Sequence, residues 1–232
     1  MNNPLDKHAV EAALLLKDKF GGKVSVFSMA PEDTQDNLRE ILAMGADEGY
    51  LISDRVFAGA DTLATSYTLA CAIKKVGEFD IIFTGNESAD GGTAQVSAQL
   101  GEWLQLPHLM HVCALDYDGF IAHVKTKIDY GFMEYEVKLP AVFGVTREIN
   151  TPRLTGVKGI LKAKGKPIYM LRLPDLTNAD KNYIGLSGSP TQPGEIYLPQ
   201  LARQGKAIDG SPEEIADRLI EEIRKAGITV GR

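Results

Sequence analysis

Short apolar runs rich in β-forming residues alternate with helical stretches in the first half of the chain, and this alternation constrains the fold more than any other feature. The runs lie at 24–29, 50–52 and 80–84. Apolar residues recur at the spacing of one helix face between these runs and also before the first of them. Strands separated by helices form a parallel sheet that helices cover on both faces. The sequence therefore predicts an α/β fold built on a parallel sheet.

The pattern changes to hairpin spacing in the middle of the chain. Asp118-Gly119 and Tyr130-Gly131 separate three strand-like stretches, at 111–116, 120–128 and 132–138. Glycine-containing turns between such stretches are typical of antiparallel β-hairpins. We expect a hairpin region that extends or flanks the parallel sheet.

The last part of the chain lacks a regular apolar pattern until its end. Residues 174–210 are rich in proline and glycine and are too irregular for a core of their own. Ser211-Pro212-Glu213-Glu214 then combines an N-cap serine, a proline at the first helical position and a glutamate three residues after the cap, which predicts a terminal amphipathic helix. We therefore divide the chain into an α/β domain with its hairpin extension, at 1–173, and a C-terminal arm and helix, at 174–232. We expect the arm to cross the surface of another chain.

The charge balance and the N-terminal residues exclude several classes of protein. Lys and Arg number 25 and Asp and Glu 31, which leaves a net charge of -6. This balance argues against broad binding to nucleic acids, because phosphate neutralisation needs a basic surface. The N-terminal region is charged throughout, and no apolar run is long enough to cross a bilayer. We expect a cytoplasmic protein without membrane insertion.

No side chains are arranged for catalysis or for metal binding. The four histidines are scattered, without cysteine or carboxylate neighbours at ligand spacing. The two cysteines fall within a helical and a strand pattern, where a buried free thiol is the simplest interpretation. Because no nucleophile–base pair is present either, any chemistry must come from a bound cofactor.

Three loops follow the predicted parallel strands at their carboxyl ends, where open α/β sheets bind nucleotides. They lie at 28–31, 59–62 and 85–96. In the third loop, Gly91 and Gly92 allow a close approach of the backbone, Thr93 offers a hydroxyl, and the following helix adds its positive end. This loop is either a phosphate-binding element or a plain strand-to-helix turn, and neither a G-x-G-x-x-G nor a Walker pattern decides between them.

Several stretches resemble the beta subunit of electron transfer flavoproteins, and together they span nearly the whole chain. The matching stretches are Asn3-Pro4-Leu5-Asp6, the AMGAD turn at 43–47, the DGGTAQV loop at 90–96, the hairpin region 124–146 and the segment 150–164. The resemblance implies an adenine-nucleotide-binding α/β domain that pairs with an alpha subunit holding a second FAD. The C-terminal arm would then embrace that subunit.

The resemblance also implies a set of site residues. Those that would contact the nucleotide of the beta subunit are Asn3, Pro4, Leu5, Asp6, Met29, Asp61, Thr62, Thr65, Gly85, Asn86, Glu87, Ser88, Ala89, Asp90, Gly91, Gly92, Thr93, Ala94, Gln95 and Val96. Residues that would meet a partner flavin dehydrogenase are Arg153, Val157 and Lys162. The nucleotide set coincides with the sheet edge chosen from the strand pattern. Val157 stands where many family members place an anchoring leucine, and the family's first strand has no counterpart in this sequence.

The resemblance leaves two alternatives for the nucleotide. The stretch 54–65 is similar to that of electron-bifurcating members, which favours FAD. In that mechanism NADH would deliver a hydride, one electron would go to ferredoxin or flavodoxin, and the other would go through the alpha subunit to the flavin dehydrogenase. The alternative is an electron carrier that binds AMP as a structural ligand and does not bifurcate. A more distant alternative is an adenylate-binding stress or signalling protein of the same fold.

Overall fold

The computed structural model describes residues 2–176, 179–192, 194–195 and 205–228. It contains two compact units, Met1–Gln192 and Pro193–Arg232, which are described separately below. No described helix is both long and apolar enough to cross a membrane.

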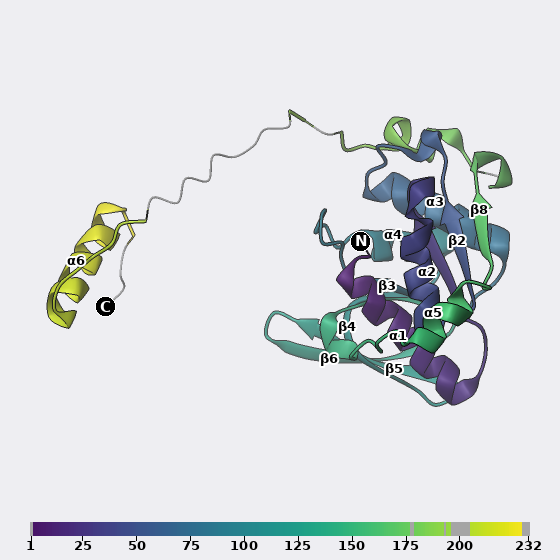
Figure 1. Cartoon of the computed structure of the whole chain (residues 1–232), viewed down its shortest axis with the longest axis horizontal. Helices are drawn as coiled ribbons and strands as arrows, with labels where there is room; N and C mark the ends of the chain where they lie inside the picture. The colour runs from purple at the N-terminus through teal and green to yellow at the C-terminus, as the bar shows by residue number, and fades with distance from the viewer. Residues whose placement is uncertain (1, 177–178, 193, 196–204, 229–232) are drawn as a thin grey trace. The chain divides into compact units, whose positions relative to one another are not determined.

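Two β-sheets form the centre of the first unit (Figure 1). One contains β1 (Ser25–Met29), β2 (Glu48–Ile52) and β8 (Ile168–Leu171), all parallel, in the order β1-β2-β8. The other contains β3 (Ile81–Gly85), β7 (Ala141–Val145), β4 (His108–Tyr117), β5 (Ile121–Ile128) and β6 (Gly131–Lys138), in the order β3-β7-β4-β5-β6. The pairs β3·β7 and β7·β4 are parallel, whereas β4·β5 and β5·β6 are antiparallel. The α/β fold with its antiparallel extension is confirmed.

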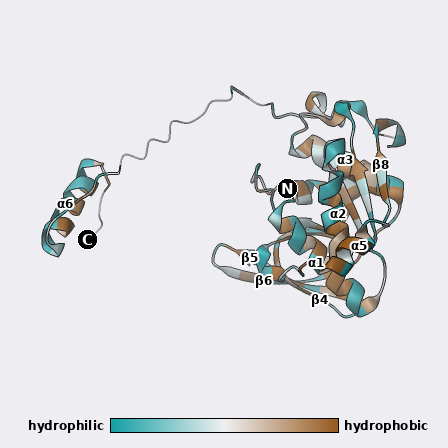
Figure 2. Ribbon diagram, viewed as in Figure 1, coloured by the Kyte–Doolittle hydropathy of each residue, from teal (hydrophilic) through white to brown (hydrophobic). Residues whose placement is uncertain are grey.

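The parallel strands carry helices on both faces. The helices are α1 (Pro4–Phe20), α2 (Gln35–Met44), α3 (Thr62–Val76), α4 (Val96–Leu104) and α5 (Val157–Ala163). Successive residues of β1 point to opposite faces, as a strand requires. Val26 packs with the cluster formed by α1, α2 and α5, and Phe27 packs with the clusters beneath α3 and α4. Figure 2 shows that α1 and α5 both carry apolar residues.

Strands β1 and β3 are each paired on one side only among the described residues. A cavity of about 820 Å³ lies between them, lined by residues of both strands and of α1 and α3. All five residues of β1 and of β3 are half-buried, whereas all five residues of β7 are buried. The two blocks of parallel strands are therefore separated by a gap that helices cover on both faces.

Residues beyond the predicted domain boundary at 173/174 still belong to the first unit. The short 3-10 helices η4 (Leu173–Asp175), η5 (Lys181–Tyr183) and η6 (Leu186–Gly188) lie in this segment. Leu176 and Ile184 are buried against Ile52 of β2 and Ala72 of α3. The first unit thus ends at Gln192. Apolar residues of this segment pack beside α3, although they form no regular pattern in the sequence.

The second unit contains one described helix, α6 (Pro212–Lys225). Ser211 Oγ accepts the Glu214 N–H, and the Glu214 side chain accepts the Ser211 N–H, so the predicted capping box is confirmed. Ile215, Leu219 and Ile220 are exposed on this helix, which alternates polar and apolar surface (Figure 2). Contact of this unit with an alpha subunit stays a prediction, and residues 196–204 of the arm lie outside the described residues.

Candidate functional site

The N-terminus of α1 is fastened to the loop after β3, and this contact assembles one edge of the site. Gly85 N–H donates to Asp6 Oδ1 at 3.0 Å. The Asn3 amide donates to Glu87 O at 2.9 Å, and Ala89 N–H donates to Asn3 Oδ1 at 3.2 Å. A Cβ on Gly85 would lie 2.5 Å from Asp6 Oδ1 and 3.0 Å from Asp6 N, so only glycine allows this approach. Asn3 and Asp6 therefore shape the loop through hydrogen bonds to its backbone.

The start of α3 and the start of α4 are joined by side-chain hydrogen bonds. Thr62 Oγ1 donates to Gln95 Oε1 at 2.9 Å, and Gln99 Nε2 donates to Thr62 Oγ1 at 3.3 Å. The predicted residues at 61–62 and at 85–96 thus lie side by side, although more than thirty positions separate Thr62 from Gln95 in the chain.

Helices α3 and α4 differ in how their first N–H groups are used. Asp61 Oδ1 accepts the N–H groups of Leu63 and Ala64, both at 3.0 Å, and Asp61 Oδ2 accepts the Thr191 N–H at 3.0 Å. Burial alone would raise the pKa of Asp61, but these N–H groups hold it below its usual range. Gln95 at the start of α4 makes no side-chain cap. The free donors of α4 are therefore better suited to an anion than those of α3.

The glycine-rich loop has a backbone suited to an anion. Gly92 and Ala94 have φ of 55° and 52°, and left-handed residues of this kind turn successive N–H groups toward one side. Gly91 N–H is held by Ser88 Oγ and by Asp90 Oδ1, at 3.2 and 2.7 Å. Thr93 is exposed in the same loop. The exposed Thr93 and the uncapped start of α4 are therefore candidate donors to an anion.

Gln99 was not anticipated from the sequence, yet it carries the one buried side-chain N or O atom without a hydrogen-bond partner among the described residues. That atom is Gln99 Oε1. A buried acceptor without a partner is rare in folded proteins. It lies beside Thr62, next to the predicted nucleotide loop. Extending the loop motif by one helical turn beyond Gln95 would have found it.

Other predicted residues have structural places at the same edge. Asn86 is buried, and its Oδ1 accepts the His111 N–H at 2.9 Å, which ties the loop to β4. Met29 packs in the apolar cluster beneath α3. Thr65 N–H closes the first turn of α3 on Asp61 O at 2.9 Å. Pro4 and Leu5 form the first turn of α1, and Val96 begins α4.

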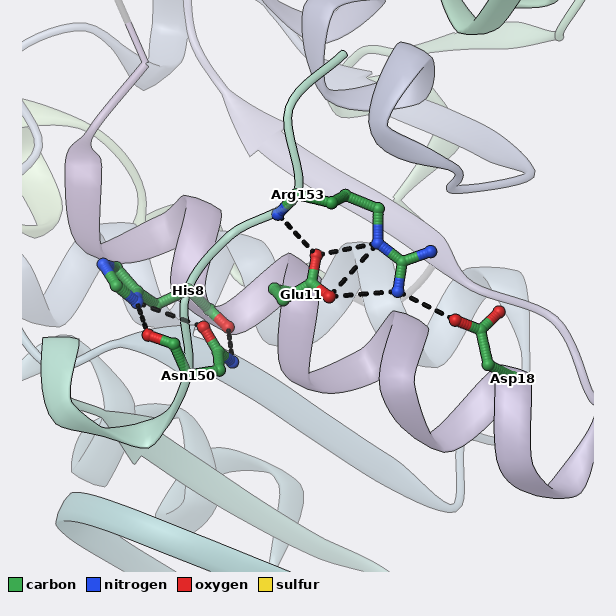
Figure 3. Close-up of polar contacts among 5 residues, drawn as sticks. All are labelled: His8, Glu11, Asp18, Asn150 and Arg153. Carbon is green, nitrogen blue, oxygen red and sulfur yellow. Dashed lines mark hydrogen bonds and ion pairs between the residues drawn. The ribbon is translucent and has the colours of Figure 1, made fainter. Parts of the chain in front are cut away.

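The predicted docking residues lie on a different part of the surface. Val157, the first residue of α5, is 75% exposed, and Leu154 just before it is 96% exposed. Lys162 is also exposed. Arg153 differs from these three, because its guanidinium is bound within the chain by Glu11 and Asp18 (Figure 3). The docking segment, residues 154–162, therefore presents apolar side chains with a lysine beside them.

Comparison with known proteins gives a consistent result. The model of the electron transfer flavoprotein domain matches residues 2–176. The electron transfer flavoprotein subunit beta of Thermoanaerobacterium thermosaccharolyticum is 41% identical, over 95% of this chain and 85% of that protein. That of Clostridium acetobutylicum is 40% identical, over 96% and 85%. The caffeyl-CoA reductase-Etf complex subunit CarD of Acetobacterium woodii is 39% identical, over 97% and 87%.

Proposed function

Since the chain belongs to the electron transfer flavoprotein family, as a beta subunit with a role in electron transfer, we propose that it binds FAD and takes part in electron bifurcation. Bound FAD would supply the redox chemistry, taking a hydride from NADH and passing single electrons to ferredoxin or flavodoxin and to a partner flavin dehydrogenase. The chain itself would work in a heterodimer with an alpha subunit. Its own residues bind and orient the nucleotide.

The observation that carries the proposal is the cradle formed by the starts of α3 and α4. Thr62, Gln95 and Gln99 are joined by hydrogen bonds, and Gln99 Oε1 is left without a donor. Beside it, the uncapped start of α4 and the left-handed Gly92 and Ala94 offer backbone N–H groups to the phosphates of a nucleotide. The fit favours a nucleotide in general, and the preference for FAD rests on residues 54–65 and on the relative named for the caffeyl-CoA reductase-Etf complex.

Different residues around the cradle would bind the phosphates and support the loop. The uncapped start of α4 and the Thr93 hydroxyl would hold the phosphates, since helix N-termini attract negative charge. The Asp61 carboxylate accepts the first N–H groups of α3, so these donors are not available to a ligand. Its negative charge would also repel phosphates from the start of that helix. Asn3 and Asp6 would fix the loop that carries Thr93.

Counting nucleotides tests this proposal directly. We expect the heterodimer, denatured and separated by chromatography, to release two FAD molecules, one from each subunit. One FAD together with one AMP would instead identify a carrier whose beta nucleotide is structural, and bifurcation would be rejected.

Thr93→Ala should weaken retention of the nucleotide. Removing a hydrogen bond to a charged group costs about 1.5–3 kcal/mol, which corresponds to a loss of affinity of about tenfold or more. The nucleotide that remains bound after repeated dilution and filtration measures the loss. Ser25→Ala is a matched control, because Ser25 Oγ donates to Glu48 at the opposite end of β1. Equal retention in both variants would remove Thr93 from the site.

We further propose that the docking segment meets the flavin dehydrogenase. Leu154 and Val157 would enter an apolar pocket of the partner, and Lys162 would lie on the polar rim. The arm and α6 would bury their apolar residues against the alpha subunit. These two contacts use different units of the chain.

A further inference from the structure

Glu11 is a buried carboxylate in the middle of α1, and Arg153 binds it through several hydrogen bonds. The residue is 3% exposed. Arg153 donates to its carboxylate from the backbone N, from Nε and from Nη2, at 3.0, 2.9 and 3.0 Å, and Arg153 Nη2 also donates to Asp18 at 2.8 Å (Figure 3). Planar, two-pronged pairing of this kind fixes direction as well as distance. Arg153 is therefore locked in both backbone and side chain.

A second contact holds the chain one helical turn away. The Asn150 amide donates to His8 O at 2.9 Å, and His8 Nδ1 lies 3.1 Å from both Asn150 O and Asn150 Oδ1 (Figure 3). His8 and Glu11 are three residues apart on α1, so they face the same side of the helix. Residues 150 and 153 are thus attached to one rigid element immediately before Leu154.

The far end of the docking segment is attached to α2. Arg39 Nη1 donates to Ala163 O at 2.9 Å and also to Lys166 O, and Lys166 Nζ donates to Leu42 O at 2.9 Å. A Cβ on Gly159 would lie 2.5 Å from Ala43 O, which shows how closely α5 approaches α2. The docking segment therefore spans two anchored ends, and its apolar residues are exposed between them.

We propose that Glu11 is a positioning residue for the docking segment: through Arg153 it fixes the positions from which the Leu154 and Val157 side chains project into solvent. The inference rests on the proposed docking function. Glu11 cannot touch a partner, since it is buried, and Arg153 directs its backbone N–H, Nε and Nη2 at Glu11 and Asp18. Holding the segment in its docking conformation before contact removes an ordering cost that binding would otherwise carry. Arg153 thus belongs to the support of the docking surface.

The test is a double-mutant cycle in the complete heterodimer, with a purified acyl-CoA dehydrogenase as electron acceptor. Glu11→Gln and Arg153→Ala should each raise the half-saturating concentration of the dehydrogenase by roughly tenfold, the scale of one charged hydrogen bond. Turnover at saturation and bound nucleotide should be unchanged. The double variant should be no worse than Arg153→Ala alone, because Glu11 acts only through Arg153. Amide hydrogen exchange at residues 153–157 should accelerate in all three.

Two further variants separate positioning from general stability. Arg153→Lys keeps the charge beside Glu11 without the two-pronged geometry, and it should also raise the half-saturating concentration of the dehydrogenase. It replaces Glu11→Gln in the test if that variant fails to fold. Asp116→Asn removes the ion-pair partner of Lys19, which lies near the end of α1. This variant should change neither the half-saturating concentration nor the hydrogen exchange. Additive losses, or faster exchange at an unchanged half-saturating concentration, would overturn the positioning role alone. If Val157→Asp also leaves transfer intact, the docking function falls with it.

Discussion

Val157→Asp should reduce electron transfer to the flavin dehydrogenase by at least about thirtyfold, since replacing a central interface anchor costs about 2 kcal/mol or more. Val157 is 75% exposed at the start of α5, so the monomer loses little by the change. A carboxylate placed in an apolar pocket of the partner would be desolvated without a counter-ion. Steady-state turnover against dehydrogenase concentration measures the loss, and nucleotide content should stay the same.

Matched variants identify the source of that effect. Val157→Thr keeps the branched shape and adds no charge, so it should fall between wild type and Val157→Asp. Lys162→Ala should lower the association rate and its dependence on salt, as expected for a charge on the rim. If Val157→Asp released the nucleotide to the same extent as it slowed transfer, the docking segment would have a different role.

Phe143→Ala should destabilise the first unit by about 3–5 kcal/mol, the range for removing a buried aromatic side chain. Phe143 is 0% exposed at the centre of β7, between Phe83 of β3 and Leu109 of β4. Its ring centroid lies 5.9 Å from that of Phe83, and it packs with Ala9 of α1. The cavity left behind cannot be filled by a strand that is paired on both sides. Urea denaturation followed by the fluorescence of Trp103, the single tryptophan, measures the change.

Phe132→Ala is the matched control for that experiment. Phe132 lies on β6 and is 58% exposed, with Lys125 Nζ 5.0 Å from its ring centroid, so its removal should change the free energy of unfolding by only about 1 kcal/mol or less. Similar losses in the two variants would mean that β7 is not the centre of the core.

The sequence predicted the elements whose signal is local. The strands β1 to β3 appear as apolar runs, because parallel strands covered on both faces are apolar along their length. The turns at Gly119 and Gly131 predicted the antiparallel extension, and the cap at Ser211 predicted α6. Each of these features is set by neighbours in the chain.

Features that depend on distant residues were missed. The pairing of Glu11 with Arg153 joins positions 142 residues apart, and nothing near either residue reveals it. Leu176 and Ile184 belong to no regular apolar pattern in the sequence, and their burial depends on packing against α3 and β2. Gln99 lacks a motif of its own, and its importance depends on Thr62 lying opposite. Leu154 was overlooked because exposure cannot be known before the segment is placed.

The gap between β1 and β3 has a consequence for how the two sheets relate to each other. Each strand presents a row of N–H and C=O groups toward the cavity, and such rows can pair with an extended chain. Because both rows face the same cavity, one extended stretch of polypeptide seated between them would complete both hydrogen-bond ladders and merge the two sheets into one.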